Sequence, residues 1–184
     1  MKLVNANKNP YLSVITKMLD DLKWKKKKTG HTYDNNGKRH TLSRANISEG
    51  NQTEIEAFVL GKVKAYHSKT LVNAAANRRY PELLITLKKF VKYQFPNHRW
   101  NAIQLNKNVK TSYHFDKGNI GESLCIGLGN FKSGGGIEII VGGKHYKIDN
   151  KNKWLVYSGN KYEHKTIPHS GGTRYAVIFF QKRR

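Results

Sequence analysis

The spacing of hydrophobic residues changes near residue 98, and this change separates expected helices from expected strands. Before it, apolar residues recur every three to four positions, as they do along one face of a helix. This spacing predicts a short amphipathic helix over residues 11–24 and another that begins at Pro81 and ends before Pro96. Proline suits the first turn of a helix, because the N–H that it lacks would have no partner there.

Residues 53–67 fit two kinds of element. Thr53 and Glu56 stand at the spacing of a capping box, which predicts a helix over this segment. The apolar run from Phe58 to Leu60 is also typical of a strand. We take the helix as the expectation, so that helices fill most of residues 53–95.

From Trp100 onward, short apolar runs alternate with turns that are rich in glycine or polar residues. Gly142-Gly143 separates two such runs and predicts a hairpin. Many short strands with regular turns are typical of a sandwich or jelly roll. The pattern therefore predicts an α+β fold with a cupin-like jelly-roll core at residues 100–184 and N-terminal helices packed on it. The expected strands are 102–105, 123–128, 137–141, 144–148, 154–157 and 175–180.

Residues 1–52 are expected to form a basic N-terminal extension, a helix plus a loop, ahead of a single domain over residues 53–184. The segment from Lys23 to Arg44 contains eight Lys and Arg residues and one acid, Asp34. Aromatic side chains interleave with these cations, which suits base stacking and phosphate contact. A solvated loop explains the same residues equally well. An Asn-Gly pair within the segment can turn a hairpin, but its polar composition favours a loop.

The whole chain is strongly basic, with 34 Lys and Arg residues against 12 Asp and Glu residues and a formal net charge of +22. This excess is far larger than solubility requires, and it favours a polyanionic partner. We therefore expect a nucleic-acid partner. Lys and Asn are both abundant, so a coding bias toward these residues is the alternative explanation.

Cys125 is the only cysteine, so no intramolecular disulfide can form, and its apolar neighbours predict burial in the core. The first residues lack the apolar core of a signal peptide. No stretch approaches the roughly 18–20 apolar residues of a membrane span. We expect an intracellular protein of the cytoplasm or nucleus, neither secreted nor bound to a membrane.

A candidate metal site begins with His114 and Asp116. Residues two apart in an extended segment point to the same side, so this pair can chelate one metal ion. A second imidazole from a neighbouring strand is needed, and His164 lies 50 residues later. Two histidines and one carboxylate hold Fe(II) on one face and leave three positions open, which a 2-oxo acid and O₂ can take.

Arg174 follows His164 by ten residues and opens the last expected strand. A buried guanidinium there can hold the far carboxylate of a dicarboxylate through two parallel hydrogen bonds. A surface cation is the ordinary alternative. Asn106 and Asn119 flank the His-x-Asp pair and are candidates for contact with co-substrate or substrate. Asparagine at such positions also commonly serves only to form turns.

These residues resemble the Fe(II)- and 2-oxoglutarate-dependent oxygenases of the double-stranded β-helix fold. Within them, the TET/JBP-like group, which oxidises pyrimidine bases in nucleic acid, is the most similar. The resemblance implies that His114, Asp116 and His164 bind iron and that Arg174 binds 2-oxoglutarate. It covers a little under half of the chain, and residues 53–99 more loosely. The resembling stretches are 104–108, 114–123, 127–131, 134–137, 164–168 and 172–175.

The chain departs from this family in two places. Family members often carry Ser two residues after the arginine, where this chain has Ala176, so another donor must assist Arg174. Many also have Gly-Gly-Glu-Leu where this chain has Gly135-Gly136-Ile137. Neither change removes an expected metal ligand.

The resemblance and the charge together predict a dioxygenase that uses Fe(II), 2-oxoglutarate and O₂ to oxidise a nucleobase in DNA or RNA, with a pyrimidine methyl group as one candidate. A hydroxylase of Pro, Lys or Asn side chains in proteins would share every metal feature. A cupin-like binding module without activity would not need the His-x-Asp pair and Arg174 together. A basic nucleic-acid-binding protein without activity would leave the three candidate ligands unexplained.

Overall fold

The structure is a computed structural model and describes all residues except 30, 34, 42–46, 48–51, 66–69 and 184. The helices are α1 (Leu12–Asp21), α2 (Ala76–Arg79) and α3 (Pro81–Gln94). The N-terminal strands are β1 (Lys2–Asn5), β2 (Lys26–Lys28), β3 (His31–Tyr33), β4 (Arg39–Thr41), β5 (Glu54–Lys64) and β6 (Leu71–Asn73). The C-terminal strands are β7 (Ala102–Lys107), β8 (Asn119–Gly129), β9 (Ser133–Gly134), β10 (Ile137–Val141), β11 (Lys144–Ile148), β12 (Lys153–Tyr157), β13 (Glu163–Thr166), β14 (His169–Ser170) and β15 (Arg174–Lys182).

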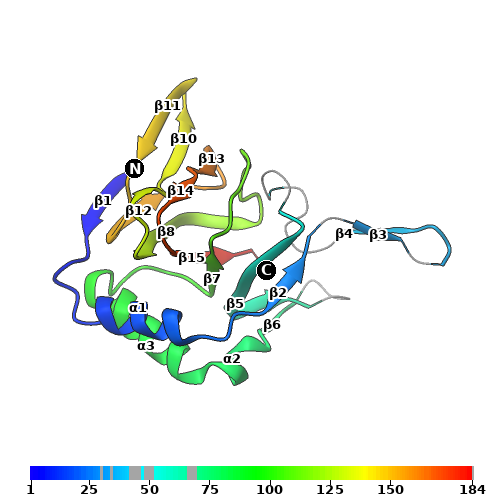
Figure 1. The fold of residues 1–184 in the computed structure, drawn as a ribbon, viewed down its shortest axis with the longest axis horizontal. Coiled ribbons are helices and arrows are strands. Elements are labelled where there is room, and N and C mark those ends of the chain that lie inside the picture. Colours follow the sequence, from blue (N-terminus) through cyan, green and yellow to red (C-terminus); the bar gives the residue numbers. More distant parts are fainter. Residues whose placement is uncertain (30, 34, 42–46, 48–51, 66–69, 184) are drawn as a thin grey trace.

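Among the described residues, strand pairing builds one large antiparallel sheet, one small three-stranded sheet and two separate strand pairs. The large sheet has the order β1-β12-β8-β15-β7-β5-β2, and β6 also pairs with β5. The small sheet has the order β11-β10-β13, and β9 pairs with β14. In Figure 1 the helices lie on one side of the large sheet, while β10, β11 and β13 lie on the other. Two facing sheets of short strands confirm the predicted jelly-roll core.

The two larger of three hydrophobic clusters among the described residues lie on either side of the large sheet. The larger cluster joins α1 and α3 to the sheet and includes Leu19, Phe90 and Trp154, all with no exposed surface. Because α1 and α3 pack against each other and against the sheet, they bury the helix side of the core. The smaller cluster lies between the two sheets and consists of Cys125, Ile137, Ile139, Leu155 and Tyr157.

Two of the three expected helices are confirmed. The apolar stripe over residues 11–24 forms α1, and Pro81 opens α3, which ends before Pro96. Buried positions along α3 recur at three- and four-residue intervals, as the sequence pattern predicted. None of the helices among the described residues is long and apolar enough to span a bilayer.

The predicted helix over residues 53–67 is wrong, because this segment is strand β5. β5 pairs with β7 along six consecutive positions and uses both of its faces. Phe58 and Leu60 pack into the helix-side cluster, whereas Ile55 and Ala57 are buried on the opposite face with Val109. A helix would present only one apolar stripe, so it could not bury both sets. The capping-box spacing is a local signal that sheet pairing overrides.

The predicted loop within residues 29–52 is also only partly right. Strands β3 and β4 pair as an antiparallel hairpin around the Asn-Gly pair, and Gly37 takes the positive φ of +74° that such a turn requires. In Figure 1 this hairpin projects away from the body of the molecule. The segment ahead of residue 52 adds β1 and β2 to the two ends of the large sheet, besides the expected helix. The domain boundary at residue 52 stays a prediction.

Gly61 allows β5 to pass close to the chain that leads into β7. Its φ is +85°, and a Cβ there would overlap the carbonyl oxygen of Asn101. We expect Gly61→Ala to lower the free energy of unfolding by about 2–4 kcal/mol, because the strained φ and the overlap add. Gly142→Ala is the matched control, since Gly142 also has a positive φ but nothing within 4 Å. It should cost only about 1 kcal/mol. Urea unfolding measures both free energies. If the two variants lost the same amount, this explanation would be contradicted.

Candidate metal centre

The backbone places His114 and His164 opposite each other. The two residues form an isolated antiparallel bridge, in which each N–H donates to the carbonyl oxygen of the other at 3.0 Å. His164 belongs to β13, whereas His114 lies in the segment between β7 and β8. The N–H of Asp116 donates to the carbonyl of Gly159 at 2.9 Å, which fixes the carboxylate next to both imidazoles. The fold therefore places His164 beside the His-x-Asp pair, as the sequence analysis expected.

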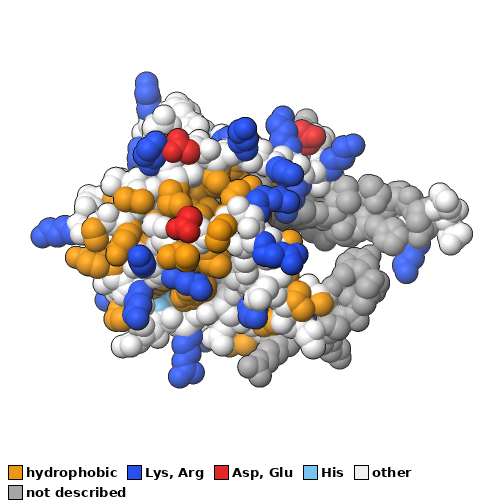
Figure 2. All heavy atoms as spheres, turned by 90° about the horizontal axis from the view of Figure 1, so that it is seen from below, with side chains coloured by type: hydrophobic (Ala, Val, Ile, Leu, Met, Phe, Trp, Pro, Cys, Tyr) orange, Lys and Arg blue, Asp and Glu red, His pale blue; other side chains and the backbone are white. Residues whose placement is uncertain are grey.

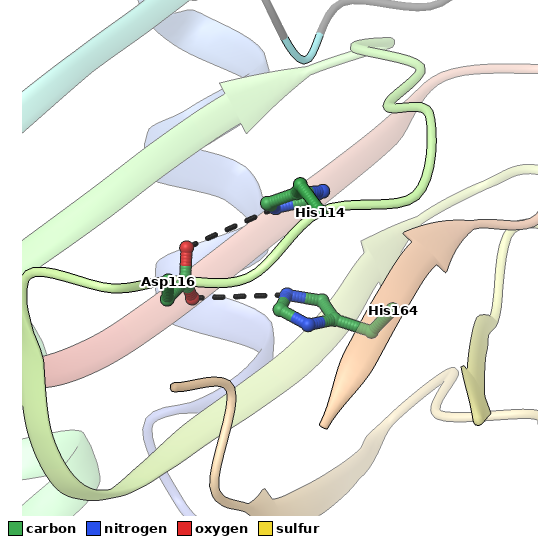
Figure 3. Close-up of side chains that lie close together, drawn as sticks. All are labelled: His114, Asp116 and His164. Atoms are coloured by element: carbon green, nitrogen blue, oxygen red, sulfur yellow. Dashed lines mark ion pairs between the residues drawn. The ribbon is translucent and has the colours of Figure 1, made fainter. Parts of the chain in front are cut away.

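The side chains of these three residues converge, as Figure 3 shows. Asp116 Oδ1 lies 3.8 Å from His114 Nε2, and Asp116 Oδ2 lies 3.7 Å from His164 Nε2. One ligand atom from each residue lies within 4.8 Å of the others, as a shared metal ion requires. A Cβ at Gly159 would lie 2.9 Å from Asp116 Oδ2, so glycine there leaves room for the carboxylate.

Hydrogen bonds set the tautomer of both imidazoles. His114 Nδ1 lies 2.8 Å from the carbonyl oxygen of Ser112, and His164 Nδ1 lies 3.0 Å from that of Tyr162. A carbonyl oxygen can only accept, so both Nδ1 atoms carry the proton. In the neutral rings Nε2 is then the deprotonated nitrogen, which is the form that binds a metal.

A cavity of about 100 Å³ joins this centre to the other candidate residues. Its lining includes every residue that the sequence singled out for the site, so these residues are brought together. It also includes residues that sequence reasoning did not single out. The lining residues are Gln104, Asn106, Thr111, His114, Asp116, Asn119, Cys125, Ile137, Tyr157, His164, Lys165, Thr166, Arg174, Ala176, Ile178 and Phe180.

Arg174 is buried in this cavity with 1% of its surface exposed. Its Nε donates to the carbonyl oxygen of Gly135, and its Nη2 is buried without a hydrogen-bond partner among the described residues. Burial lowers the pKa of the guanidinium, because the charged form loses its hydration. A buried cation with an unsatisfied donor is costly unless an anion joins it. The cavity therefore fits a carboxylate at Arg174 and a divalent metal at the three ligand residues.

Asn106 stands opposite Ala176, the position at which the family that the sequence resembles often carries serine. Asn106 and Ala176 are direct partners in the β7–β15 ladder. Gln104 Nε2 donates to Asn106 Oδ1 at 2.9 Å, so the acceptor of this amide is used, and Asn106 lines the cavity.

Asn119 and Cys125 line the same cavity from β8. The N–H of Asn119 donates to the carbonyl of Asp116 at 2.9 Å, so this residue closes the turn after the His-x-Asp pair and still presents its side chain to the cavity. Cys125 is buried, as predicted, and burial raises the pKa of its thiol to about 11. The thiol therefore stays protonated near neutral pH and is a poor nucleophile.

Sequence reasoning missed several polar residues of the cavity wall. Thr111 and Thr166 share a hydrogen bond of 3.0 Å between their hydroxyl oxygens, and Tyr157 Oη lies 3.4 Å from His164 Nε2. Thr166 follows His164 by two positions on β13, so strand alternation could have found it. Thr111 and Tyr157 come from other elements, and only the folded chain brings them near the centre.

Solved structures with a similar fold include oxygenases. NgTET1 in complex with 5mC DNA matches with a TM-score of 0.52 and 15% identity, over 69% of this chain and 61% of that chain. A 2OG-Fe(II) oxygenase family oxidoreductase from Burkholderia pseudomallei matches with a TM-score of 0.56 and 17% identity, over 94% of this chain and 79% of that one. No protein-family model and no curated protein matches the sequence.

A third similar structure is a prolyl hydroxylase in complex with a hypoxia inducible factor peptide fragment from Trichoplax adhaerens. It has a TM-score of 0.51 and 10% identity, over 98% of this chain and 83% of that chain. This chain therefore has the double-stranded β-helix fold of 2-oxoglutarate and Fe(II) oxygenases, as the resemblance implied. The match to NgTET1 spans 61% of that chain, so it compares only part of that protein with this one.

Proposed function

We propose that this chain is an Fe(II)- and 2-oxoglutarate-dependent dioxygenase that oxidises a nucleobase in DNA or RNA. The observation that carries the oxygenase assignment is the pairing of two features in one cavity. His114, Asp116 and His164 offer the donor set that suits Fe(II), and the buried Nη2 of Arg174 lacks a partner among the described residues. A metal site alone would not need the buried guanidinium.

Each residue has a defined task in this proposal. His114, Asp116 and His164 would hold the iron, while Arg174 and the NH₂ group of Asn106 would bind and orient 2-oxoglutarate. Iron with 2-oxoglutarate and O₂ supplies the oxidising chemistry when bound. Apolar side chains in the cavity wall limit access of water to the centre; they are Ile137, Ile178 and Phe180.

Charge supports a nucleic-acid substrate. The chain has a net charge of +22, and the cavity wall includes Lys165, whose Nζ also pairs with Glu138 at 3.7 Å. Exposed Lys117 lies one residue after Asp116, and exposed Lys161 lies three residues before His164. Exposed cations this close in sequence to the metal ligands would hold the phosphates that flank a target base. A base in a duplex must leave the stack to reach a buried centre, which costs a few kcal/mol.

A protein side-chain hydroxylase is the second candidate. The fold likeness to a prolyl hydroxylase favours it, and the metal centre is compatible with either substrate. Basic charge does not exclude a peptide substrate, because acidic segments could bind such a surface. The two candidates differ in which polymer stimulates turnover.

Formation of succinate from 2-oxoglutarate distinguishes these functions. We expect DNA or RNA containing 5-methylcytosine to stimulate succinate formation at least tenfold over the rate without substrate, with a matching mass increase in the base. Peptides that contain Pro, Lys or Asn should not do so. Stimulation by a peptide alone would make the chain a protein hydroxylase. Nucleic-acid binding without succinate under any condition would leave only a binding protein.

A further inference from the structure

A hollow of about 400 Å³ lies at the outer edge of the large sheet, separate from the metal centre. β2 pairs with β5 only over Glu54–Glu56, and β6 pairs with it only over Lys62–Lys64. The strand edge between these two stretches faces the hollow. The lining residues are Lys25, Lys26, Lys27, Ala57, Phe58, Val59, Val63, Ala74, Ala75, Ala76, Arg79 and Tyr80.

Half-buried Val59 lines this hollow at a stretch of β5 that neither β2 nor β6 pairs with. Gly61, two residues later, turns its N–H outward to Asn77 Oδ1 at 2.8 Å, and its carbonyl accepts from the N–H of Ala74 at 2.9 Å. Peptide groups alternate along a strand, so the N–H and carbonyl of Val59 point to the same outer edge as those of Gly61. No described residue bonds to them. Such an edge can pair with another strand.

The hollow also concentrates positive charge. Lys26 pairs with Glu54 at 3.5 Å, but Lys25, Lys27 and Arg79 have no ion-pair partner among the described residues. Burial and the nearby Arg79 lower the pKa of Lys27, because both disfavour its charged form. On the neighbouring face over the helices, Lys and Arg side chains surround an apolar area with few acids (Figure 2). The hollow therefore favours an anionic occupant.

We propose that this hollow binds an extended acidic peptide segment of a partner protein, which adds to the edge of β5 as a short strand. The open stretch of about four residues is roughly 13 Å long, at about 3.3 Å per residue. Main-chain hydrogen bonds to Val59 would give the segment its register, and acidic side chains would meet Lys25, Lys27 and Arg79. The outward carbonyl oxygen of Val59 would repel a phosphate but accepts an N–H from a peptide. For this reason a peptide fits better than a nucleic-acid backbone.

Lysines on an edge strand also protect against unwanted pairing between sheets, and β2 consists of three of them. Protection does not account for Arg79, which comes from α2 and lines the same hollow. Protection also does not explain why Val59 is left unpaired in the middle of the edge, where a strand of another sheet could pair most easily. Both features are expected of a binding site.

Calorimetric titration of the full chain with the capped peptide Glu-Val-Glu-Val-Glu tests the proposal. We expect Arg79→Glu to weaken binding at least tenfold through charge reversal. Lys88→Glu is the matched control, because exposed Lys88 makes the same charge change on α3 outside the hollow. It should leave the affinity within about twofold. Equal losses in both variants would show that only net charge matters and would overturn the site.

Two N-methylated peptides test strand addition without changing the protein. One carries N-methyl groups on both valines and the other on all three glutamates. Only one set of N–H groups can face Val59, so one peptide should lose at least tenfold in affinity while the other retains it. The proposal would be overturned if both methylated peptides kept the affinity of the parent peptide, or if the parent peptide did not bind. Binding of a thymidine pentanucleotide instead, lost in Arg79→Glu, would assign the hollow to nucleic acid.

Discussion

His114→Ala is expected to weaken Fe(II) binding at least ~100-fold and to reduce succinate formation to background. The side chain is one of three that converge within 4.8 Å, and two remaining ligands hold a divalent ion far less tightly. The Nδ1 proton bonded to Ser112 orients this ring, so its loss also removes an ordered ligand. Anaerobic titration with Fe(II), or with Co(II) followed by its visible absorption, measures the affinity directly.

His145→Ala is the matched control for this experiment. His145 lies on the β10–β11 hairpin, where Nδ1 contacts Glu138 at 2.9 Å, and it does not line the cavity. Its replacement should leave metal affinity within about twofold. A His114→Ala variant that retains full metal affinity and turnover would refute the iron centre. Loss of affinity in both variants would point to general unfolding, which a thermal melt would reveal.

Arg174→Met is expected to remove most of the affinity for 2-oxoglutarate while it leaves metal binding in place. Truncation of one partner in a buried, hydrogen-bonded charge pair costs about 2–5 kcal/mol, which corresponds to a loss of at least ~30-fold. Anaerobic titration of the metal-loaded protein with 2-oxoglutarate measures this loss. Arg174→Lys keeps the charge but loses the planar pair of donors, so it should recover only part of the affinity.

The stability of the ligand-free protein gives a second test of whether Arg174 serves binding or stability. Its guanidinium is buried, and Nη2 lacks a partner among the described residues, so an apolar side chain of similar length should raise the melting temperature or leave it unchanged. Addition of 2-oxoglutarate should then stabilise the original protein and not the variant. A large loss of stability in Arg174→Met, with unchanged ligand affinity, would make this arginine a structural residue.

His114 and Asp116 could be predicted because their spacing reflects local geometry, whereas the family resemblance assigned His164, 50 residues after His114, to the same site. His114 and Asp116 stand two apart, and Thr166 repeats that spacing after His164. Asn106 was a candidate from its position beside the motif, but its orientation by Gln104 depends on the β7 backbone. Its place opposite Ala176 depends on the register of two strands that are far apart in sequence. No spacing along the chain encodes that register.

The segment 53–67 shows where local signals fail. Its capping-box spacing and apolar run are compatible with a helix, but its apolar residues serve two separate cores once β7 lies beside it. The gap between β2 and β6, which leaves Val59 open, likewise arises from three segments that meet only in the fold.

By itself the sequence determined the jelly-roll class, the two outer helices, the basic charge and the residues that converge at the centre. The fold class, the helices and the charge follow from short-range periodicity or composition, which persist whatever the neighbours are, and the family resemblance joined His164 to His114 and Asp116. The tertiary structure alone decided that residues 54–64 form a strand, that Asn106 faces Ala176 and that Arg174 is buried with an unsatisfied donor. These features depend on long-range pairing and desolvation, which arise only when distant segments pack together.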